Sequence, residues 1–149
     1  MASDQLTELF HQKKRKLPPS GDGAVRRDTW IAAVNDLYKV IEDKYLAGSR
    51  GDVEVVHPDK VVTEAFIGEY HIPEMVLRVG DEQVVFSPKG TNIFGAKGRI
   101  DLAGDCGDAT IVWEGDDRWN IVMARTPALS MAPFTADSLA ETLTRIMRP

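Results

Sequence analysis

The segment Ile111–Met123 reads IVWEGDDRWNIVM and predicts a β-hairpin. Its centre, Gly115-Asp116-Asp117, has the composition of a three-residue turn, and apolar residues alternate with polar ones on both sides. Such a turn places Trp113 opposite Trp119 and Glu114 opposite Arg118. Because side chains alternate between the two faces of a strand, one face then carries Ile111, Trp113, Trp119, Ile121 and Met123. The segment therefore indicates an antiparallel sheet with one apolar face.

The chain before this hairpin repeats the pattern. Met75, Leu77 and Val79 alternate before Gly80-Asp81-Glu82, and Val84 and Phe86 alternate after it. A turn at Gly80-Asp81 or at Asp81-Glu82 places all five on one face. Further strand candidates are Asp52–Val56, Val61–Tyr70, Asn92–Phe94 and Gly98–Leu102. Successive strands joined by tight turns are antiparallel, so a doubly wound nucleotide-binding sheet is not expected.

Helical patterns lie on either side of the strands. Trp30, Val34, Leu37, Ile41 and Tyr45 recur at steps of four, three, four and four, which predicts an amphipathic helix from about Ala24 to Leu46 that ends before Gly48. A second helix is predicted after Thr135, which suits an N-cap position, and it extends to about Ile146. The segment Ala128–Pro133 between the strands and this helix is predicted to be a crossing loop.

These patterns predict one α+β domain spanning residues 1–149. Its curved antiparallel meander of about six or seven strands is expected to be packed on one face by an N-terminal and a C-terminal helix. Residues 1–23 are predicted to form a basic, flexible or loosely docked arm, and residues 24–149 the globular body. A chain of 149 residues is long enough to bury a core without disulfides or metals.

Composition and charge indicate which cell compartment and which classes of partner to expect. The single cysteine excludes an internal disulfide, and the first residues lack the pattern of a secretory signal. No stretch approaches the roughly 20 apolar residues that span a bilayer. We therefore expect a cytoplasmic protein with no membrane partner. The net charge of −5 divides into +3 for residues 1–27 and −8 for residues 28–149, so the acidic body repels nucleic acid while the arm attracts it.

Two basic segments are candidate contact sites. The first is Lys13-Lys14-Arg15-Lys16, which is either a solvated helix end that leads into a linker or an electrostatic arm. The second is PKGTNIFGAKGRI, residues 88–100, which carries Lys89, Lys97 and Arg99. Ala96 precedes Lys97, Gly98 follows it, and the next residues form a strand pattern, so the segment is not a P-loop. We interpret it as a bend between strands; contact with an anion or a partner is the alternative.

Other chemistry-bearing residues give weaker signals. Cys106 could pair with His11, His57 or His71 as a nucleophile, and Asp101, Asp105 and Asp108 could gather around a cation, but turn composition explains both patterns. No zinc-binding spacing and no catalytic motif is present. We therefore predict no cofactor, no metal site and no enzymatic activity.

Three functions remain open. The first is a small protein-interaction module, accessory, regulatory, chaperone-like or immunity-like, whose partner is another protein. The alternative is binding of nucleic acid or an anionic ligand through the basic arm and the glycine-rich segment 89–99. The third is an enzyme whose site is assembled from scattered residues. A basic stripe, an apolar patch or a deep pocket would distinguish them.

Overall fold

A computed structural model of the chain describes residue 7 and residues 21–49, 51–91, 96–125 and 128–149. The helical elements are α2 (Gly21–Val40), the π-helical turn η1 (Ile41–Tyr45), the 3₁₀ turn η2 (Ala47–Ser49) and α3 (Ala136–Ile146). The strands are β1 (Glu54–Val56), β2 (Asp59–Glu64), β3 (Gly68–Pro73), β4 (Met75–Val79), β5 (Glu82–Gly90), β6 (Gly98–Gly104), β7 (Gly107–Gly115), β8 (Arg118–Ala124) and β9 (Ser130–Pro133).

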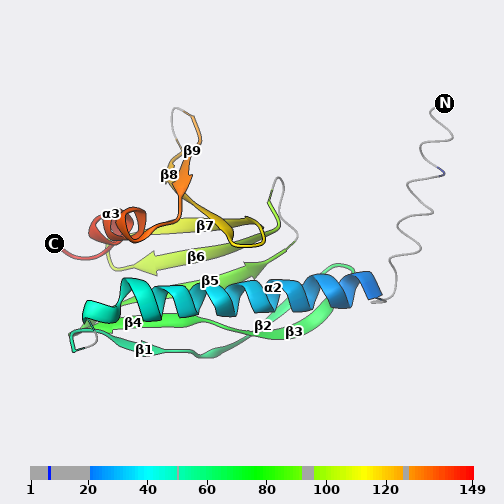
Figure 1. Ribbon diagram of the computed structural model, residues 1–149, viewed down its shortest axis with the longest axis horizontal. Coiled ribbons are helices and arrows are strands. Elements are labelled where there is room, and N and C mark those ends of the chain that lie inside the picture. The colour runs from blue at the N-terminus through cyan, green and yellow to red at the C-terminus, as the bar shows by residue number, and fades with distance from the viewer. Residues whose placement is uncertain (1–6, 8–20, 50, 92–95, 126–127) are drawn as a thin grey trace.

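The main sheet confirms the predicted α+β meander. Its seven strands lie in the order β1-β4-β5-β6-β7-β8-β9, and every neighbouring pair is antiparallel. Figure 1 shows α2 lying along the sheet in front of β4 and β5, and α3 beside the ends of β6 and β7. Residues of both helices and of the sheet face beneath them form one apolar core. Among the described residues, no helix is both long and apolar enough to cross a membrane.

A second, two-stranded sheet was not predicted. The segment proposed as one strand, Val61–Tyr70, is instead a hairpin in which β2 pairs with β3, with Val62 opposite Tyr70. The prediction is wrong because the chain reverses at Ala65–Ile67, where Phe66 and Gly68 adopt positive φ angles of 69° and 91°. The hairpin lies beside the last part of β5, beyond the point where β4 stops pairing with it at Met75 and Phe86. The proposed strand Asn92–Phe94 falls outside the described residues.

The β7–β8 hairpin, predicted from Ile111–Met123, has the predicted pairing of its tryptophans but a shorter turn. Trp113 lies opposite Trp119, as predicted, whereas Gly115 lies opposite Arg118. The predicted pairing of Glu114 with Arg118 is therefore wrong, and the turn is the two-residue Asp116-Asp117. Gly115 and Asp116 adopt φ angles of 109° and 50°, which close the tight turn, and the extra residue is accommodated as a bulge between Trp113 and Gly115.

The other hairpin and the helices follow their patterns closely. Of the two turns left open, the structure has Gly80-Asp81, with Val79 opposite Glu82. The predicted helix stripe faces the core: Trp30, Val34, Leu37 and Ile41 are all buried. Thr135 caps α3 in a capping box with Ser138. The crossing loop predicted at Ala128–Pro133 is wrong over its last four residues, because β9 pairs there with β8 and satisfies the backbone edge of that strand.

An indole cluster joins α2 to the sheet. The ring of Trp30 lies 5.8 Å from that of Trp113 and 6.0 Å from that of Trp119, and the latter two rings are 6.0 Å apart. Trp30 also fills the space above Gly98, which has no side chain to exclude it. The aromatic cluster therefore contributes to the packing of α2 on the sheet, and two of its members, Trp113 and Trp119, also line the groove described below.

Candidate functional site

The structure separates the cations predicted from the glycine-rich segment. Lys89 and Arg99 line one hollow, of about 410 Å³, on the sheet face opposite the helices. Lys97 lines a different hollow, beside Arg26 of α2. Arg99 forms an ion pair with Asp101, with its Nε 2.8 Å from Oδ1 and its Nη2 2.9 Å from Oδ2. Lys13, Lys14, Arg15 and Lys16 lie outside the described residues.

The first hollow, which we call the outer-face hollow, is built from strands far apart in the sequence. Its lining comes from β5, β6, β7 and the end of β8: Val85, Ser87, Lys89, Arg99, Asp101, Leu102, Ala103, Asp108, Ala109, Thr110 and Arg125. Ser87 of β5 pairs with Asp101 of β6, and Gly90 pairs with Arg99. Lys89 is the extra residue of the bulge between Pro88 and Gly90, and it lines the same hollow as Arg99. The side chains that point away from the apolar core thus bring these polar groups together on the sheet face opposite the helices.

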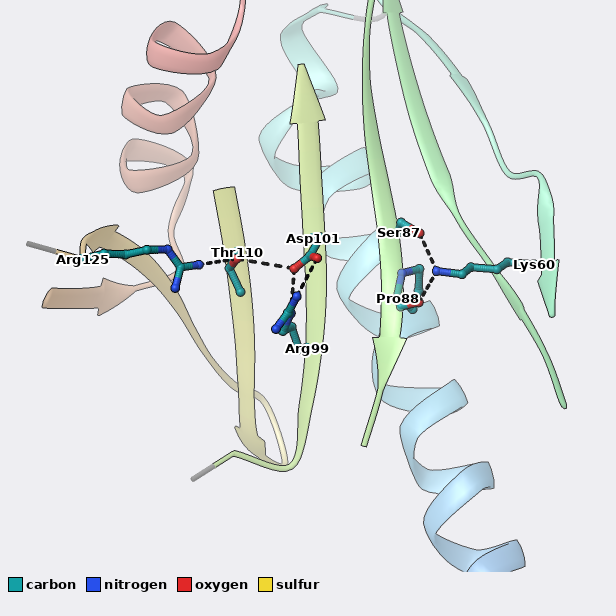
Figure 2. Close-up of polar contacts among 7 residues, drawn as sticks. All are labelled: Lys60, Ser87, Pro88, Arg99, Asp101, Thr110 and Arg125. Carbon is teal, nitrogen blue, oxygen red and sulfur yellow. Dashed lines mark hydrogen bonds and ion pairs between the residues drawn. The ribbon is translucent and has the colours of Figure 1, made fainter. Parts of the chain in front are cut away.

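Sequence reasoning missed two cations here: Arg125, which lines the hollow, and Lys60, which contacts the lining residue Ser87. Arg125 Nη2 donates to Thr110 Oγ1 at 2.8 Å, and Thr110 Oγ1 lies 3.4 Å from Asp101 Oδ1. Figure 2 shows these side chains following one another across the strands, with Lys60 approaching β5 from β2 on the other side. Nothing local in the sequence marks Lys60 or Arg125, because both reach the hollow only through tertiary packing.

Lys60 occupies a constrained position. Its Nζ donates to Ser87 Oγ at 2.7 Å and to the carbonyl oxygen of Pro88 at 2.8 Å, on the edge of β5 that β4 leaves unpaired. Partial burial, and then the positive charge of Lys89, lowers the pKa of Lys60 below its ordinary value. Two ammonium groups are thus held close together at one rim of the hollow.

A larger depression of about 630 Å³ lies between α2 and the tip of the β7–β8 hairpin. We call it the tryptophan groove. Its apolar lining consists of Ala32, Ala33, Leu37, Val40, Tyr45, Trp113, Trp119 and Phe134. Its polar lining consists of Asp28, Thr29, Asp36, Asp116 and Asp117. The groove is therefore apolar at its base and negatively charged at its rim. The sequence contains a local pattern that could have indicated this groove, because Asp116 and Asp117 form a turn between Trp113 and Trp119.

Most of the rim charge is unneutralised. Asp28 forms an ion pair with Arg27, at 2.9 Å between Oδ1 and Nε. Within the described part of the chain, Asp36, Asp116 and Asp117 take part in no ion pair. The carbonyl oxygen of Asp116 accepts a hydrogen bond from Trp113 Nε1 at 2.9 Å, which ties the rim to the base. The carboxylates are held beside the aromatic surface by the turn itself.

Of the remaining predicted candidates, His11 lies outside the described residues, and most of the others contact different groups. Cys106 is exposed at the β6–β7 turn. His57 contacts Glu42, and His71 contacts Asp59, so neither ring is positioned by a bond to the thiol. Asp101 pairs with Arg99 and Asp105 with Arg148, while the carbonyl of Asp108 faces Arg145. Among the described residues, no group of three or more potential ligands is arranged to hold a metal ion.

Comparison with known proteins leaves these surfaces to be judged on their chemistry. No protein-family model, no curated protein and no solved structure matches the chain.

Proposed function

We propose that this protein is a non-catalytic interaction module that receives a segment of a partner protein in the tryptophan groove. The observation that carries the proposal is the groove itself: an aromatic base of Trp113, Trp119 and Phe134 beneath a rim of aspartates, in about 630 Å³. Apolar depressions with rigid aromatic walls are where partner side chains anchor most strongly. An accessory, regulatory, chaperone-like or immunity-like role in the cytoplasm would be consistent with this activity.

The chemistry of the groove favours one kind of occupant. An apolar side chain that enters it displaces water from the indole faces, and the partner's flanking residues then meet Asp36, Asp116 and Asp117. Lysine or arginine at those flanks complements the rim, whereas aspartate or glutamate is repelled. We therefore infer a partner segment with an apolar anchor and basic flanks, such as a basic amphipathic helix laid along α2.

A binding role explains the groove better than catalysis does. Among the described residues that line it, the only ionisable side chain besides the four aspartates is that of Tyr45. The lining contains no cysteine, histidine or lysine that could work with a carboxylate as nucleophile or general base. Hydrophobic anchoring and charge complementarity are the properties that these residues supply.

Variants of one helix can test the proposal. Ala32 is exposed on α2 and lines the groove, whereas Asn35 is exposed on the same helix outside its lining. Affinity capture from the native cell extract should use the full chain as bait, as wild type, Ala32→Arg and Asn35→Arg. A synthetic amphipathic peptide with lysine flanks, and its glutamate-flanked counterpart, should be titrated against the same three proteins by calorimetry.

We expect the Ala32→Arg substitution to abolish capture and peptide binding, because it fills the groove and repels basic flanks. The matched Asn35→Arg variant should behave as wild type. Binding of the lysine peptide should exceed that of the glutamate peptide and weaken as salt is added. A captured partner that Ala32→Arg retains fully, together with equal binding of both peptides, would contradict the proposal.

A further inference from the structure

Independently of the tryptophan groove, we propose that the outer-face hollow binds the phosphate group of a small phosphorylated ligand. The cations that would hold it are Lys60 and Lys89 on one side and Arg125 on the other. Figure 2 shows Lys60 and Arg125 approaching the centre of the sheet face from opposite edges. A volume of about 410 Å³ is within the range of small-molecule sites and far exceeds one water molecule.

The first support is a crowding of positive charge. Partial burial, and then the charge of Lys89, lowers the pKa of Lys60, and the negative charges of Glu74 and Asp101 oppose this shift without reversing it. Lys60 is fixed by Ser87 Oγ and the Pro88 carbonyl, so it cannot swing away from Lys89 without losing both hydrogen bonds. Neither lysine forms an ion pair with a carboxylate within the described residues. An anion seated between the two ammonium groups converts this repulsion into attraction.

The second support is the orientation of the neighbouring polar groups. Both carboxylate oxygens of Asp101 are engaged by Arg99, which removes much of the negative charge that would oppose an anion. Within the described part of the chain, the hydrogen-bond partner of Arg125 is the uncharged hydroxyl of Thr110, and no carboxylate pairs with its guanidinium. Asp108 also lines the hollow, from β7. Because its carboxylate repels an anion, we expect the phosphate to lie nearer to β5.

Phosphate suits this arrangement better than a carboxylate ligand does. A phosphate group offers three or more oxygens to donors converging from several directions, and arginine and lysine are its usual partners. Ser87, whose hydroxyl already accepts from Lys60, can donate its own proton to a ligand oxygen. The donors lie on β5, just after β8 and on β2, which also suits a compact ligand better than an extended nucleic-acid strand.

Pyrophosphate is the probe for the test, with inorganic phosphate and a single-stranded RNA oligonucleotide as the other arms. Each is titrated calorimetrically into the full chain at low and at moderate salt. The site variants are Lys89→Ala, Lys60→Met and Arg125→Ala. Lys89 is exposed, so Lys89→Ala tests the site with the least effect on folding. Lys97→Ala is the matched control, because Lys97 is an exposed lysine of the neighbouring hollow.

We expect pyrophosphate to bind the wild type, and each site variant to bind it about tenfold more weakly, the effect of one close charge near a protein surface. Lys97→Ala should bind as wild type. Pyrophosphate should also raise the pKa of Lys60, followed by NMR of its side-chain nitrogen. The proposal would be overturned if pyrophosphate showed no saturable binding in the millimolar range. It would also be overturned if Lys97→Ala lost as much affinity for pyrophosphate as the site variants do. Tighter binding of RNA than of pyrophosphate, falling steeply with salt, would overturn it in favour of nucleic acid.

Discussion

At the scale of single residues, Gly98 shows how a missing side chain positions a helix. A Cβ built at this position would lie 2.1 Å from Cζ3 and 2.5 Å from Cε3 of Trp30. Gly98 does not have a positive φ angle, so its role is close approach rather than backbone conformation. Gly98 therefore has a packing role within β6, whereas the sequence interpretation had it as part of a bend between strands; Gly95 lies outside the described residues.

Replacing Gly98 with alanine should destabilise the fold. The added methyl group must displace the buried indole of Trp30, and overpacking of this kind costs about 1–3 kcal/mol in the free energy of unfolding. Urea denaturation of Gly98→Ala measures this loss. Gly48→Ala is the matched control, since its Cβ would meet nothing within 4 Å; its change should stay within about 0.5 kcal/mol. Equal midpoints for Gly98→Ala and the wild type would show that the indole does not occupy this space.

The candidate sites could be predicted only in part at this scale. Lys89 and Arg99 stand in one short segment, and the sequence singled them out. Lys60 meets Ser87 across 27 positions of sequence and Arg125 meets Thr110 across 15, so no local pattern relates them. Lys97 was grouped with Arg99 by proximity in sequence, but the start of β6 directs the two residues into different hollows.

At the scale of elements, alternation predicted the strands better than it predicted their turns. The buried face of β5 and most of that of β7 and β8 follow from period-two spacing. In β4 the spacing is misleading, because Val76 is buried and Val79, predicted on the apolar face, is 39% exposed. The β2–β3 turn was missed because Phe66, a residue that rarely adopts positive φ, does so there. The strand β9 was missed because Pro133 and its apolar neighbours resemble a loop, and only the open edge of β8 makes them pair.

The β2–β3 hairpin also carries a pH-dependent ion pair. His71 Nδ1 lies 2.6 Å from Asp59 Oδ2, and this hydrogen bond, together with the negative charge of Asp59, raises the pKa of His71 above its ordinary value. The histidine binds its proton more tightly in the folded state. Its contribution to stability is therefore complete below the unfolded pKa and is lost as the pH rises through the folded pKa.

NMR titration of the His71 ring should show a midpoint above that of an unfolded peptide, and Asp59→Asn should lower it. The stability difference between the wild type and Asp59→Asn should be larger at acidic pH than at pH 8. Identical ring titrations in the two proteins would mean that the pair does not form in solution. The exposed position of both groups makes the whole effect sensitive to salt.

At the scale of the whole molecule, two contacts join distant parts of the chain. The indole cluster ties α2 to the β7–β8 hairpin. At the other end, the guanidinium of Arg148 pairs with Asp81 at 2.8 Å and with Asp105 at 2.9 Å, so the segment after α3 is held against the β4–β5 and β6–β7 turns. Both contacts unite elements that the sequence predicts separately, and neither contact was predictable without the fold.

The indole cluster should behave as one energetic unit. Trp30→Ala and Trp119→Ala should each cost about 3–5 kcal/mol in the free energy of unfolding, as large aromatic truncations do. The double variant should cost less than the sum, with a coupling of about 0.5–1.5 kcal/mol for the shared aromatic contact. Val25→Ala is the control on α2, because Val25 is 64% exposed, and it should be nearly neutral. Additive costs, or losses below about 1 kcal/mol, would show that helix and hairpin are not coupled here.

The same cluster has an optical consequence. The chain contains three tryptophans, and all three are members of it, with ring centroids 5.8 to 6.0 Å apart. At such separations the transition dipoles of neighbouring indoles interact, so the native protein should give an exciton couplet in its circular dichroism. Because Trp113 and Trp119 also line the groove, the tryptophan fluorescence of the protein comes entirely from the indole cluster beside this groove. The emission spectrum of the unlabelled protein can therefore report both the docking of α2 and the arrival of a ligand beside it.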